Sequence, residues 1–290
     1  MVSRGELFSR TQRLLEESSV DSPRFDTQCI FEFAFGIPFP QIIMDRQQLV
    51  PDELSKKISV LAKKRSEGYP LQYLMKSWEF MGYEFRVGEG VLIPRPDTET
   101  LVTQVIDICR ENKWDAPKIV DLCSGSGCIA ISLKRLIPNA DVYAVELSVT
   151  AVAYIRENAE LNRVPIHIIR GDALREGTAQ LVGDADIIVC NPPYLTAEDM
   201  MRLQREVTYE PETALYGGRD GLDYYRKITP IWRSSLKDGG FLAYEFGYNQ
   251  HEAVSGILAE NGFEGISLRR DTAGITRTAA ARKITNNTED

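Results

Sequence analysis

The strongest chemical signal in the sequence is the motif Asn-Pro-Pro-Tyr, residues 191–194, which follows an apolar run expected to be a buried strand. The motif suits methylation of an amide-like NH2 group, whose nitrogen is a poor nucleophile because its lone pair is delocalised into a carbonyl. The side-chain oxygen of Asn191 and a backbone carbonyl of the loop can accept the two N–H groups. Pro192 and Pro193 stiffen this loop, and the ring of Tyr194 can stack on the planar group and exclude water.

Acceptors held in this way act on charge that develops during methyl transfer, so they favour the transition state over the ground state. Neither a metal nor a strong general base is required for this chemistry. The alternative interpretation is that the motif is only a rigid turn. Its place after the fourth expected strand, downstream of a cofactor signal, favours the functional interpretation.

A second set of residues predicts an adenosine-containing cofactor. Gly125 and Gly127 lie in a strand-to-helix turn, DLCSGSGC, where they let backbone approach a ligand closely. Glu146 ends the next expected strand and can accept hydrogen bonds from both ribose hydroxyls. Asp172 follows the third strand and could bind the adenine amino group, although a turn-forming Asp after Gly171 is the simpler alternative. NAD, FAD and S-adenosylmethionine all fit, but the full Gly-x-Gly-x-x-Gly spacing of a dinucleotide site is absent.

The elements that carry these residues alternate between strand and helix beyond Pro117. Strands are predicted at KIVDLC, DVYAVE, PIHIIR, DIIVC and FLAYEF, with two more near Ile266 and Ile275, and helices at CIAISLKRL, VTAVAYIRENAEL and His251 to Ala259. This order predicts a parallel sheet with helices on both faces, whose ligands bind beyond the carboxyl ends of the strands. The first seventy residues predict helices, Trp78 to Ile93 predicts a β-hairpin, and a helix is expected behind Pro96.

Composition narrows the class of protein. The 290 residues include 43% hydrophobic residues, enough for a packed core, and favour one catalytic domain beside a smaller one. The net charge of −8 argues against a protein that binds bare nucleic acid through its whole surface. Five cysteines without zinc-ligand spacing predict reduced thiols, no structural metal and no disulfide framework. We expect a cytoplasmic protein, because no signal core and no membrane-spanning apolar run is present.

Nearly end to end, the chain resembles the PrmC/HemK family, the release factor glutamine methyltransferases. The resemblance is carried by YPLQYLMKSWEFMGYEFRV, VLIPRPDTETLV, DLCSGSGCIAISL, IIVCNPPYL, EVTYEPETALYGGRDGLDYYRKI, GGFLAYEFGYNQ and DTAGITR. The long segment from Glu206 to Ile228 is more specific than the four-residue loop, because methyltransferases with that loop do not share it in general.

This resemblance implies a class I, Rossmann-like α/β methyltransferase fold with a mostly parallel seven-stranded sheet and a small N-terminal helical domain joined by a β-hairpin. It implies N5-methylation of the glutamine in the GGQ motif of class I peptide-chain release factors, with S-adenosylmethionine as cofactor and no metal. Asn191 and the Pro192 backbone would hold the substrate amide. The expected catalytic and substrate-binding residues are Asn191, Pro192, Pro193 and Tyr194. The expected cofactor-binding residues are Cys123, Ser124, Gly125, Ser126, Gly127, Glu146, Asp172, Ala173 and Asn191.

Two positions depart from the family's pattern. The turn usually begins with glycine where this chain has Cys123, and a positive φ at that position would strain a cysteine. Glu146 stands where Asp is more usual, and its side chain is one methylene longer. Both departures concern the geometry of the cofactor rather than the reaction.

We predict three parts: a helical domain at residues 1–76, a hairpin linker at 77–94 and a catalytic domain at 95–290. Because every cofactor and catalytic signal lies beyond Pro117, the helical domain is expected to dock the substrate protein. The nearest alternative function is methylation of an adenine amino group in DNA or RNA through the same loop, with the base flipped out of its stack. A silent adaptor with this fold is a second alternative. We expect no membrane partner and no direct binding of nucleic acid.

Overall fold

The computed structural model describes residues 1–284 and divides into two compact units. The helical unit comprises Met1–Ser77 and Leu203–Tyr209, and the sheet unit comprises Trp78–Arg202 and Glu210–Asp290. The polar stretch Asn286 to Asp290 lies outside the described residues. Within residues 1–284, no helix is long and apolar enough to cross a membrane.

The helical unit packs amphipathic helices around an apolar core. Leu15, Ile30, Phe31 and Ile58 are fully buried there, each at helical spacing from other apolar residues of its own helix. A short strand pair, in which Val2 lies opposite Val50, joins the start of the chain to the segment that precedes α4. Its elements are β1 (Val2–Ser3), α1 (Arg4–Glu17), α2 (Pro23–Phe35), α3 (Phe39–Ile43), β2 (Leu49–Val50), α4 (Asp52–Ser66), α5 (Leu71–Met75) and the 3-10 turn η2 (Val207–Tyr209).

A buried arginine holds the returning segment Leu203–Tyr209 within the helical unit. The Arg65 guanidinium donates to Asp26 at 2.6 Å and to Glu206 at 2.5 Å, and its side chain is only 4% exposed. Paired charges and hydrogen bonds are what make such burial tolerable. The helices expected in the first seventy residues are present. Through Arg65 they hold the segment Leu203–Tyr209, which is distant in sequence.

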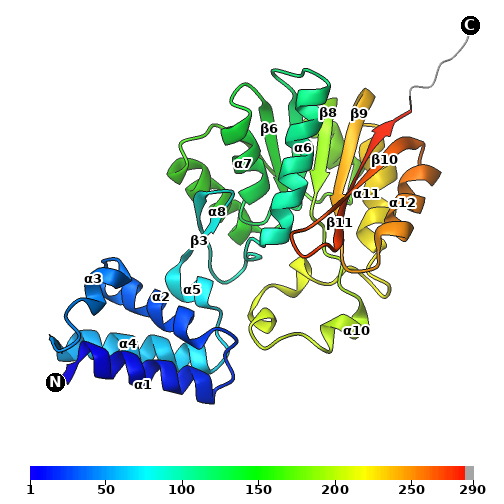
Figure 1. Ribbon diagram of the computed structural model, residues 1–290. Helices are drawn as coiled ribbons and strands as arrows, with labels where there is room; N and C mark the ends of the chain where they lie inside the picture. Colours follow the sequence, from blue (N-terminus) through cyan, green and yellow to red (C-terminus); the bar gives the residue numbers. More distant parts are fainter. Residues whose placement is uncertain (285–290) are drawn as a thin grey trace, which may run out of the picture. The chain divides into compact units, whose positions relative to one another are not determined.

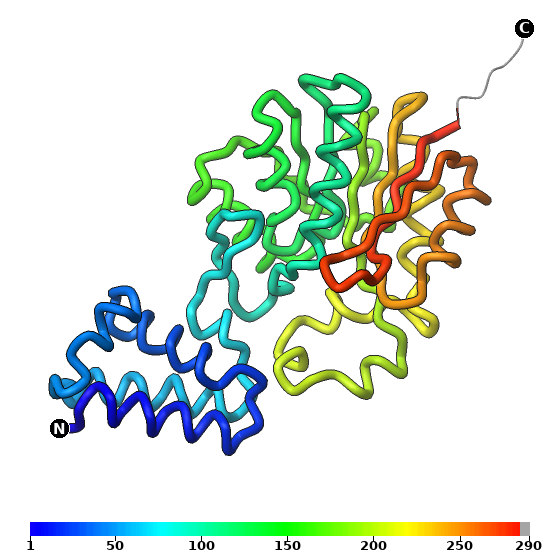
Figure 2. Tube along the Cα trace, viewed as in Figure 1, coloured from blue at the N-terminus to red at the C-terminus, as the bar shows by residue number. Residues whose placement is uncertain are grey.

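The sheet unit contains one seven-stranded sheet, in the order β10-β11-β9-β8-β5-β6-β7 (Figure 1). The neighbours from β9 to β7 pair in parallel, whereas β11 runs antiparallel to both β9 and β10. The strands are β5 (Lys118–Leu122), β6 (Asp141–Glu146), β7 (His167–Arg170), β8 (Ala185–Cys190), β9 (Leu236–Glu245), β10 (Phe263–Arg270) and β11 (Thr276–Lys283). The last two strands extend the sheet beside β9 (Figure 2).

Helices cover both faces of this sheet, as its strands require, since most of their apolar residues are buried on either side. One core packs α6 (Glu99–Glu111), α7 (Cys128–Leu136) and α8 (Val149–Leu161) against residues such as Ile119 and Ile187. The other packs α9 (Glu176–Val182), α11 (Asp223–Arg233) and α12 (His251–Glu260) against Val120 and Ile188. The three-layer α/β fold predicted from the sequence is confirmed.

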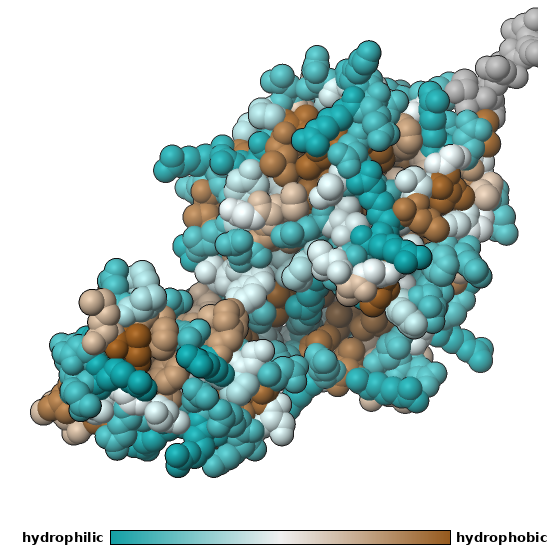
Figure 3. Space-filling view, in the orientation of Figure 1, coloured by the Kyte–Doolittle hydropathy of each residue, from teal (hydrophilic) through white to brown (hydrophobic). Residues whose placement is uncertain are grey.

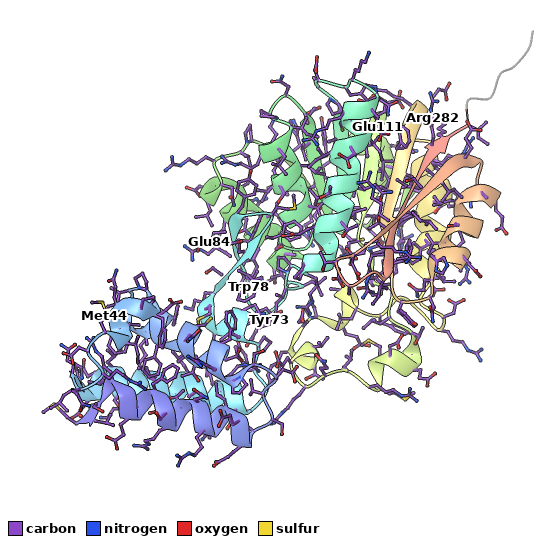
Figure 4. The ribbon with its side chains drawn as sticks, in the orientation of Figure 1. Met44, Tyr73, Trp78, Glu84, Glu111 and Arg282 are labelled. Atoms are coloured by element: carbon purple, nitrogen blue, oxygen red, sulfur yellow. The ribbon has the colours of Figure 1, made fainter. Side chains whose placement is uncertain are left out.

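From Trp78 onward, the hairpin is an anchored part of the sheet unit. It consists of β3 (Ser77–Phe80) and β4 (Tyr83–Arg86), and Figure 4 labels Trp78 and Glu84 on it. Phe80 and Phe85 are buried in the first core. The Asn158 side chain accepts from the Arg86 N–H at 2.6 Å and donates to the Arg86 carbonyl at 3.1 Å. The residues after Arg86, up to Ile93, were expected to belong to the hairpin but form no strand.

Most elements follow the sequence expectation closely. The helices CIAISLKRL and VTAVAYIRENAEL have the expected bounds as α7 and α8. The helix behind Pro96 begins as a 3-10 turn, η1 (Pro96–Thr98), and continues as α6. The remaining short elements are α10 (Ala197–Met200) and η3 (Glu212–Ala214). The expectation omitted α11, whose interior contains Pro230, and the short α9.

Candidate active site

A cavity of about 340 Å³ lies beyond the carboxyl ends of β5, β6 and β8, within the sheet unit. This volume falls in the range of small-molecule sites, and this edge is where parallel sheets bind ligands. The cavity brings together most of the residues predicted from the sequence. Those that line it are Cys123, Ser124, Gly125, Ser126, Glu146, Asp172, Ala173, Asn191 and Pro193. Gly127, Pro192 and Tyr194 do not line it.

The turn after β5 has three left-handed residues within five positions. Cys123 has φ +56°, Gly125 has φ +55° and Gly127 has φ +80°. The departure at Cys123 therefore falls at a position of positive φ, where a non-glycine residue is strained by roughly 1–3 kcal/mol. A Cβ on Gly127 would lie 3.1–3.2 Å from side-chain atoms of Ile131 and Ile155, so this glycine lets the turn pack closely on α7 and α8.

Glu146, at the end of β6, holds this turn directly. Its Oε2 accepts the N–H of Gly125 at 2.8 Å, and its Oε1 accepts the N–H of Ser148 at 2.8 Å. A carboxylate has about four acceptor positions, so two remain for a ligand that enters the cavity. The carboxylate thus joins the end of β6 to the turn after β5.

Asp121 lies fully buried beneath the same turn. Its Oδ2 accepts the N–H of Ala130 at 3.2 Å, and its Oδ1 has no hydrogen-bond partner among residues 1–284. Burial raises the pKa of this carboxyl from its usual value to about 8. At neutral pH the group therefore holds a proton that an exposed Asp would release.

Asp172 and Ala173 form the wall after β7. Asp172 Oδ1 accepts the N–H of Leu174 at 2.9 Å, so this residue shapes the turn as well as lining the cavity. The carbonyl of Ala173 accepts the indole N–H of Trp232 at 2.8 Å, from the interior of the second core. This bond anchors the wall to α11, which the sequence analysis did not identify.

The loop after β8 points Asn191 into the cavity and Tyr194 away from it. Asn191 Nδ2 donates to Thr98 Oγ1 at 3.3 Å. The ring of Tyr194 packs against the second core, and its carbonyl accepts from Gln250 Nε2 at 3.0 Å. A Cβ on Gly247 would lie 3.0 Å from that ring. The aromatic side chain therefore anchors the loop from behind in this structure.

Two glycines of the long family-like segment lie against the backbone of this loop. A Cβ on Gly217 would lie 2.5 Å from the Pro193 carbonyl oxygen and 2.7 Å from the Tyr194 Cα. A Cβ on Gly221 would lie 2.3 Å from the Tyr194 carbonyl oxygen. Only glycine allows this approach, so the segment ALYGGRDG acts as the support of the loop.

Two walls of the cavity were not predicted from the sequence. One is formed by Gly90, Val91, Leu92, Pro94, Arg95 and Thr98, and the other by Pro211, Thr213, Ala214 and Tyr224. Glu210 joins these walls, because its carboxylate accepts the Ile93 N–H at 2.9 Å and pairs with Arg95. The sequence did contain a signal for these walls, because their residues, apart from Gly90, lie within the long segments that resemble the family. These segments extend well beyond the four-residue loop and the glycine turn.

Comparisons with known proteins find relatives that cover nearly the whole chain. A family model described as PrmC N-terminal domain matches residues 6–75, and one described as Methyltransferase small domain matches residues 99–216. A release factor glutamine methyltransferase of Geobacter sulfurreducens is 36% identical over 276 residues, which are 94% of each chain. One of Fusobacterium nucleatum is 35% identical over 96% of this chain and 78% of its own length. A methyltransferase structure from Pyrococcus furiosus shares the fold, with a TM-score of 0.53 at 16% identity over 71% of this chain and 91% of that one.

Proposed function

This chain belongs to the family of release factor glutamine methyltransferases, and from that membership and its site we propose its activity. It transfers a methyl group from S-adenosylmethionine to the N5 amide nitrogen of the glutamine in the GGQ motif of class I peptide-chain release factors. The observation that carries the proposal is that one cavity contains both the Asn191 amide and the carboxylate-braced turn at Glu146.

The residues at one end of the cavity fit S-adenosylmethionine. Glu146 keeps acceptor positions for the ribose hydroxyls, and Asp172 lies in the wall where an acid can accept from the adenine amino group. The turn from Cys123 to Gly127 leaves room for a ligand, since nothing lies within 4 Å of a Cβ on Gly125. When bound, S-adenosylmethionine supplies an electrophilic methyl group on a sulfonium sulfur.

At the other end, the loop after β8 binds and orients the substrate amide. Asn191 Oδ1 accepts one of its N–H groups, and Pro193 forms the wall beside it. The Pro192 carbonyl, which the family resemblance gives as the second acceptor, is not part of the cavity lining in this structure. The Asn191 acceptor stabilises the positive charge that develops on nitrogen during transfer. The product amide is acidic while it is cationic and releases its proton to solvent, so no metal is needed. Tyr194 contributes by fixing the loop, through its packed ring and its carbonyl bond to Gln250.

The test of the function is incubation of the protein with S-adenosylmethionine carrying a labelled methyl group and one of four substrates. These are a class I release factor, the same factor with the GGQ glutamine changed to alanine, DNA and RNA. Label should enter the first alone, and peptide mapping should place it on that glutamine. Label in DNA or RNA would instead support the adenine alternative. Label in the alanine variant would mean that a residue other than the GGQ glutamine is methylated.

We further propose the division into a helical domain at 1–76, a linker at 77–94 and a catalytic domain at 95–290, with the helical domain docking the release factor in the cytoplasm. A loop that offers one glutamine gives little contact area, whereas specific complexes bury about 800 Å² per partner. Residues 1–77 carry 11 Lys and Arg and 10 Asp and Glu, so the acidic surplus lies beyond them. Docking through the helical domain must therefore depend on apolar contact more than on net charge.

Exposed apolar side chains on the helical unit give this docking a physical basis. Met44 is 86% exposed and Val60 is 57% exposed. Met44 projects from the unit in Figure 4, and apolar atoms interrupt its hydrophilic surface in Figure 3. When a partner covers such side chains, the binding free energy becomes more favourable by roughly 25 cal/mol per Å² of apolar area removed from water.

Surface variants test docking better than deletion of the helices, because deletion would also remove Arg65 from Glu206 of the returning segment. Met44→Ser combined with Val60→Ser should raise KM for the whole release factor by about tenfold. The same variant should leave turnover of a short glutamine peptide unchanged. Leu181→Ser, on a residue of the sheet unit that is 72% exposed, is the matched control. Equal effects on factor and peptide, or none on either, would contradict a docking role.

A further inference from the structure

Glu245 is a fully buried carboxylate next to the loop that carries Asn191. It ends β9, the parallel neighbour of β8, and the register pairs Cys190 with Tyr244, so Asn191 and Glu245 are the next residues along the two strands. Glu245 is only 2% exposed and does not line the cavity, whereas Asn191 and Thr98 do. The hydroxyl of Tyr225 donates to the Glu245 carbonyl at 2.8 Å and fixes its backbone. The release factor chemistry proposed above leaves this carboxylate without a role.

The Thr98 hydroxyl and the Asn191 amide lie close enough to the Glu245 carboxyl to lower its pKa. They also contact each other, since Asn191 Nδ2 donates to Thr98 Oγ1 at 3.3 Å. Glu245 Oε2 has no hydrogen-bond partner within residues 1–284, so the carboxylate has acceptor capacity to spare. A buried acceptor without a donor is costly in free energy, so neighbouring groups favour orientations in which their hydrogens point toward it.

We propose that Glu245 is a positioning residue which, through the Thr98 hydroxyl, fixes the side-chain amide of Asn191 with its oxygen turned toward the substrate glutamine. An ionised carboxylate can only accept, so the single hydrogen of the Thr98 hydroxyl goes to Glu245. The Thr98 oxygen is then left as an acceptor, and the group of Asn191 that faces it must be the NH2. The carbonyl oxygen of Asn191 consequently faces the cavity.

The orientation decides whether Asn191 can work at all in the proposed reaction. A substrate amide offers two N–H donors, and only the Asn191 oxygen can accept one of them. A reversed Asn191 would present its own NH2 to a donor and turn its oxygen toward the Thr98 oxygen and the Glu245 carboxylate. Both contacts are repulsive, so Glu245 excludes the reversed state while it is ionised.

Protonation of Glu245 should release this constraint, because a carboxylic acid can itself donate to Thr98. Burial raises the pKa of Glu245 to about 7, against the hydrogen bonds from Thr98 and Asn191, which lower it. Below that pH Glu245 is protonated and above it ionised, so turnover should rise as pH increases through about 7. The other titratable and charged groups that interact electrostatically with Glu245 are Asp97, Arg277, Cys128, Cys190, Tyr194 and Tyr225.

The first experiment follows the side-chain NH2 resonances of Asn191 by 15N–1H NMR in the full-length protein without substrate, assigned by their loss in Asn191→Ala. In the wild type they should shift with a midpoint near pH 7. The shift should disappear in Glu245→Gln, which cannot ionise, and in Thr98→Val, which has no hydroxyl. It should persist in Thr98→Ser, which keeps the hydroxyl. Wild-type resonances that do not titrate, or that titrate equally in Thr98→Val, would overturn the proposal.

The second experiment separates positioning from structure by kinetics. Thr98→Val and Glu245→Gln should lower kcat on the order of 10- to 100-fold, as a misaligned acceptor does, and change KM for the release factor little. Thr98→Ser should recover most of the loss, and the pH dependence of kcat should flatten in Glu245→Gln. Because the NMR titration needs no substrate, it holds even if the enzyme methylates another amide. A wild type inactive on release factors but titrating at Asn191 would contradict the proposed function alone.

Discussion

The two ends of the cavity are built in different ways. At the cofactor end, the turn after β5 and the carboxylate that ends β6 belong to neighbouring strands, and one side chain, Glu146, joins them through two backbone N–H groups. At the substrate end, Asn191 depends on Thr98 from the end of η1 and Glu245 from the end of β9, and its loop rests on Gly217. The first arrangement is local in sequence and the second is assembled from four distant segments.

Because of this difference, we expect substitutions at the two ends to affect different quantities, namely cofactor affinity at one end and turnover at the other. A defect at the cofactor end should weaken binding in proportion to the hydrogen bonds lost, because the strands hold the remaining contacts in place. A defect at the substrate end should lower turnover, because a small displacement of the loop misaligns the acceptors that act in the transition state.

The largest effect is expected from removal of the acceptor itself. Asn191→Ala should lower kcat on the order of 100-fold or more, because no other residue of the loop brings a side-chain acceptor into the cavity. Calorimetry with S-adenosylmethionine should show nearly unchanged affinity, since the turn and Glu146 are intact. A folded variant that turns over at close to the wild-type rate would remove Asn191 from the chemistry.

A smaller loss of turnover is expected when the support of the loop is displaced. Gly217→Ala places a Cβ within 2.5 Å of the Pro193 carbonyl oxygen, and backbone atoms must move to accept it. We expect kcat to fall about tenfold with little change in cofactor affinity. Gly256→Ala, in α12 with nothing within 4 Å of the added Cβ, is the matched control and should behave as the wild type. A weaker cofactor affinity in Gly217→Ala would show that the two ends are not separable in this way.

The same difference explains how far the sequence could go. Glycine spacing and a strand-end carboxylate are local patterns, so the sequence alone places the turn from Cys123 to Gly127 and Glu146 on their strands. The parallel sheet follows from the alternation of strands and helices. Strain at Cys123 was expected if that position had a positive φ, and the structure shows such a φ there. Local sequence patterns are sufficient to predict site residues where neighbouring strands carry them.

The substrate end was predicted only in part, because its supports are tertiary. Nothing near Thr98 or Glu245 in the sequence indicates that both face Asn191, since 93 residues separate Thr98 from Asn191. The predicted stacking role of Tyr194 used the chemistry of the ring but not its direction, and the structure packs that ring into the second core. The helix α11 was missed for a local reason, because Pro230 interrupts the pattern of a regular helix.

At the cofactor end, we expect a loss of affinity rather than of rate. Glu146→Ala should weaken S-adenosylmethionine binding by about 10- to 100-fold, as the loss of charge-assisted hydrogen bonds worth roughly 1.5–3 kcal/mol requires. Glu146→Asp should bind more tightly than Glu146→Gln. The amide of Gln would turn a donor toward the N–H of Gly125 or Ser148, whereas Asp keeps two acceptor oxygens. Calorimetry would contradict this if Gln and Asp bound equally well.

The last prediction concerns the stability contributed by Asp121, the buried carboxyl group beneath the cofactor end. Asp121 has a pKa of about 8 in the folded protein because of its burial, and an ordinary value near 4 when the chain is unfolded. Between these values the folded state binds a proton that the unfolded state has released. Stability therefore falls as pH rises from about 4 to about 8, and is steady above that range.

Asp121→Asn removes this dependence, because an amide has no proton to lose and its oxygen can still accept the N–H of Ala130. At pH 3.5, below both pKa values, the variant should match the wild type closely, and at pH 8.5 it should be more stable by at least about 1 kcal/mol, the worth of roughly one pKa unit. Chemical unfolding at the two pH values measures this directly. Equal stability differences at both pH values would mean that the folded protein already accommodates an ionised Asp121. The turn would then rest on a charged group, and the two ends of the cavity would differ in their buried electrostatics as well as in their assembly.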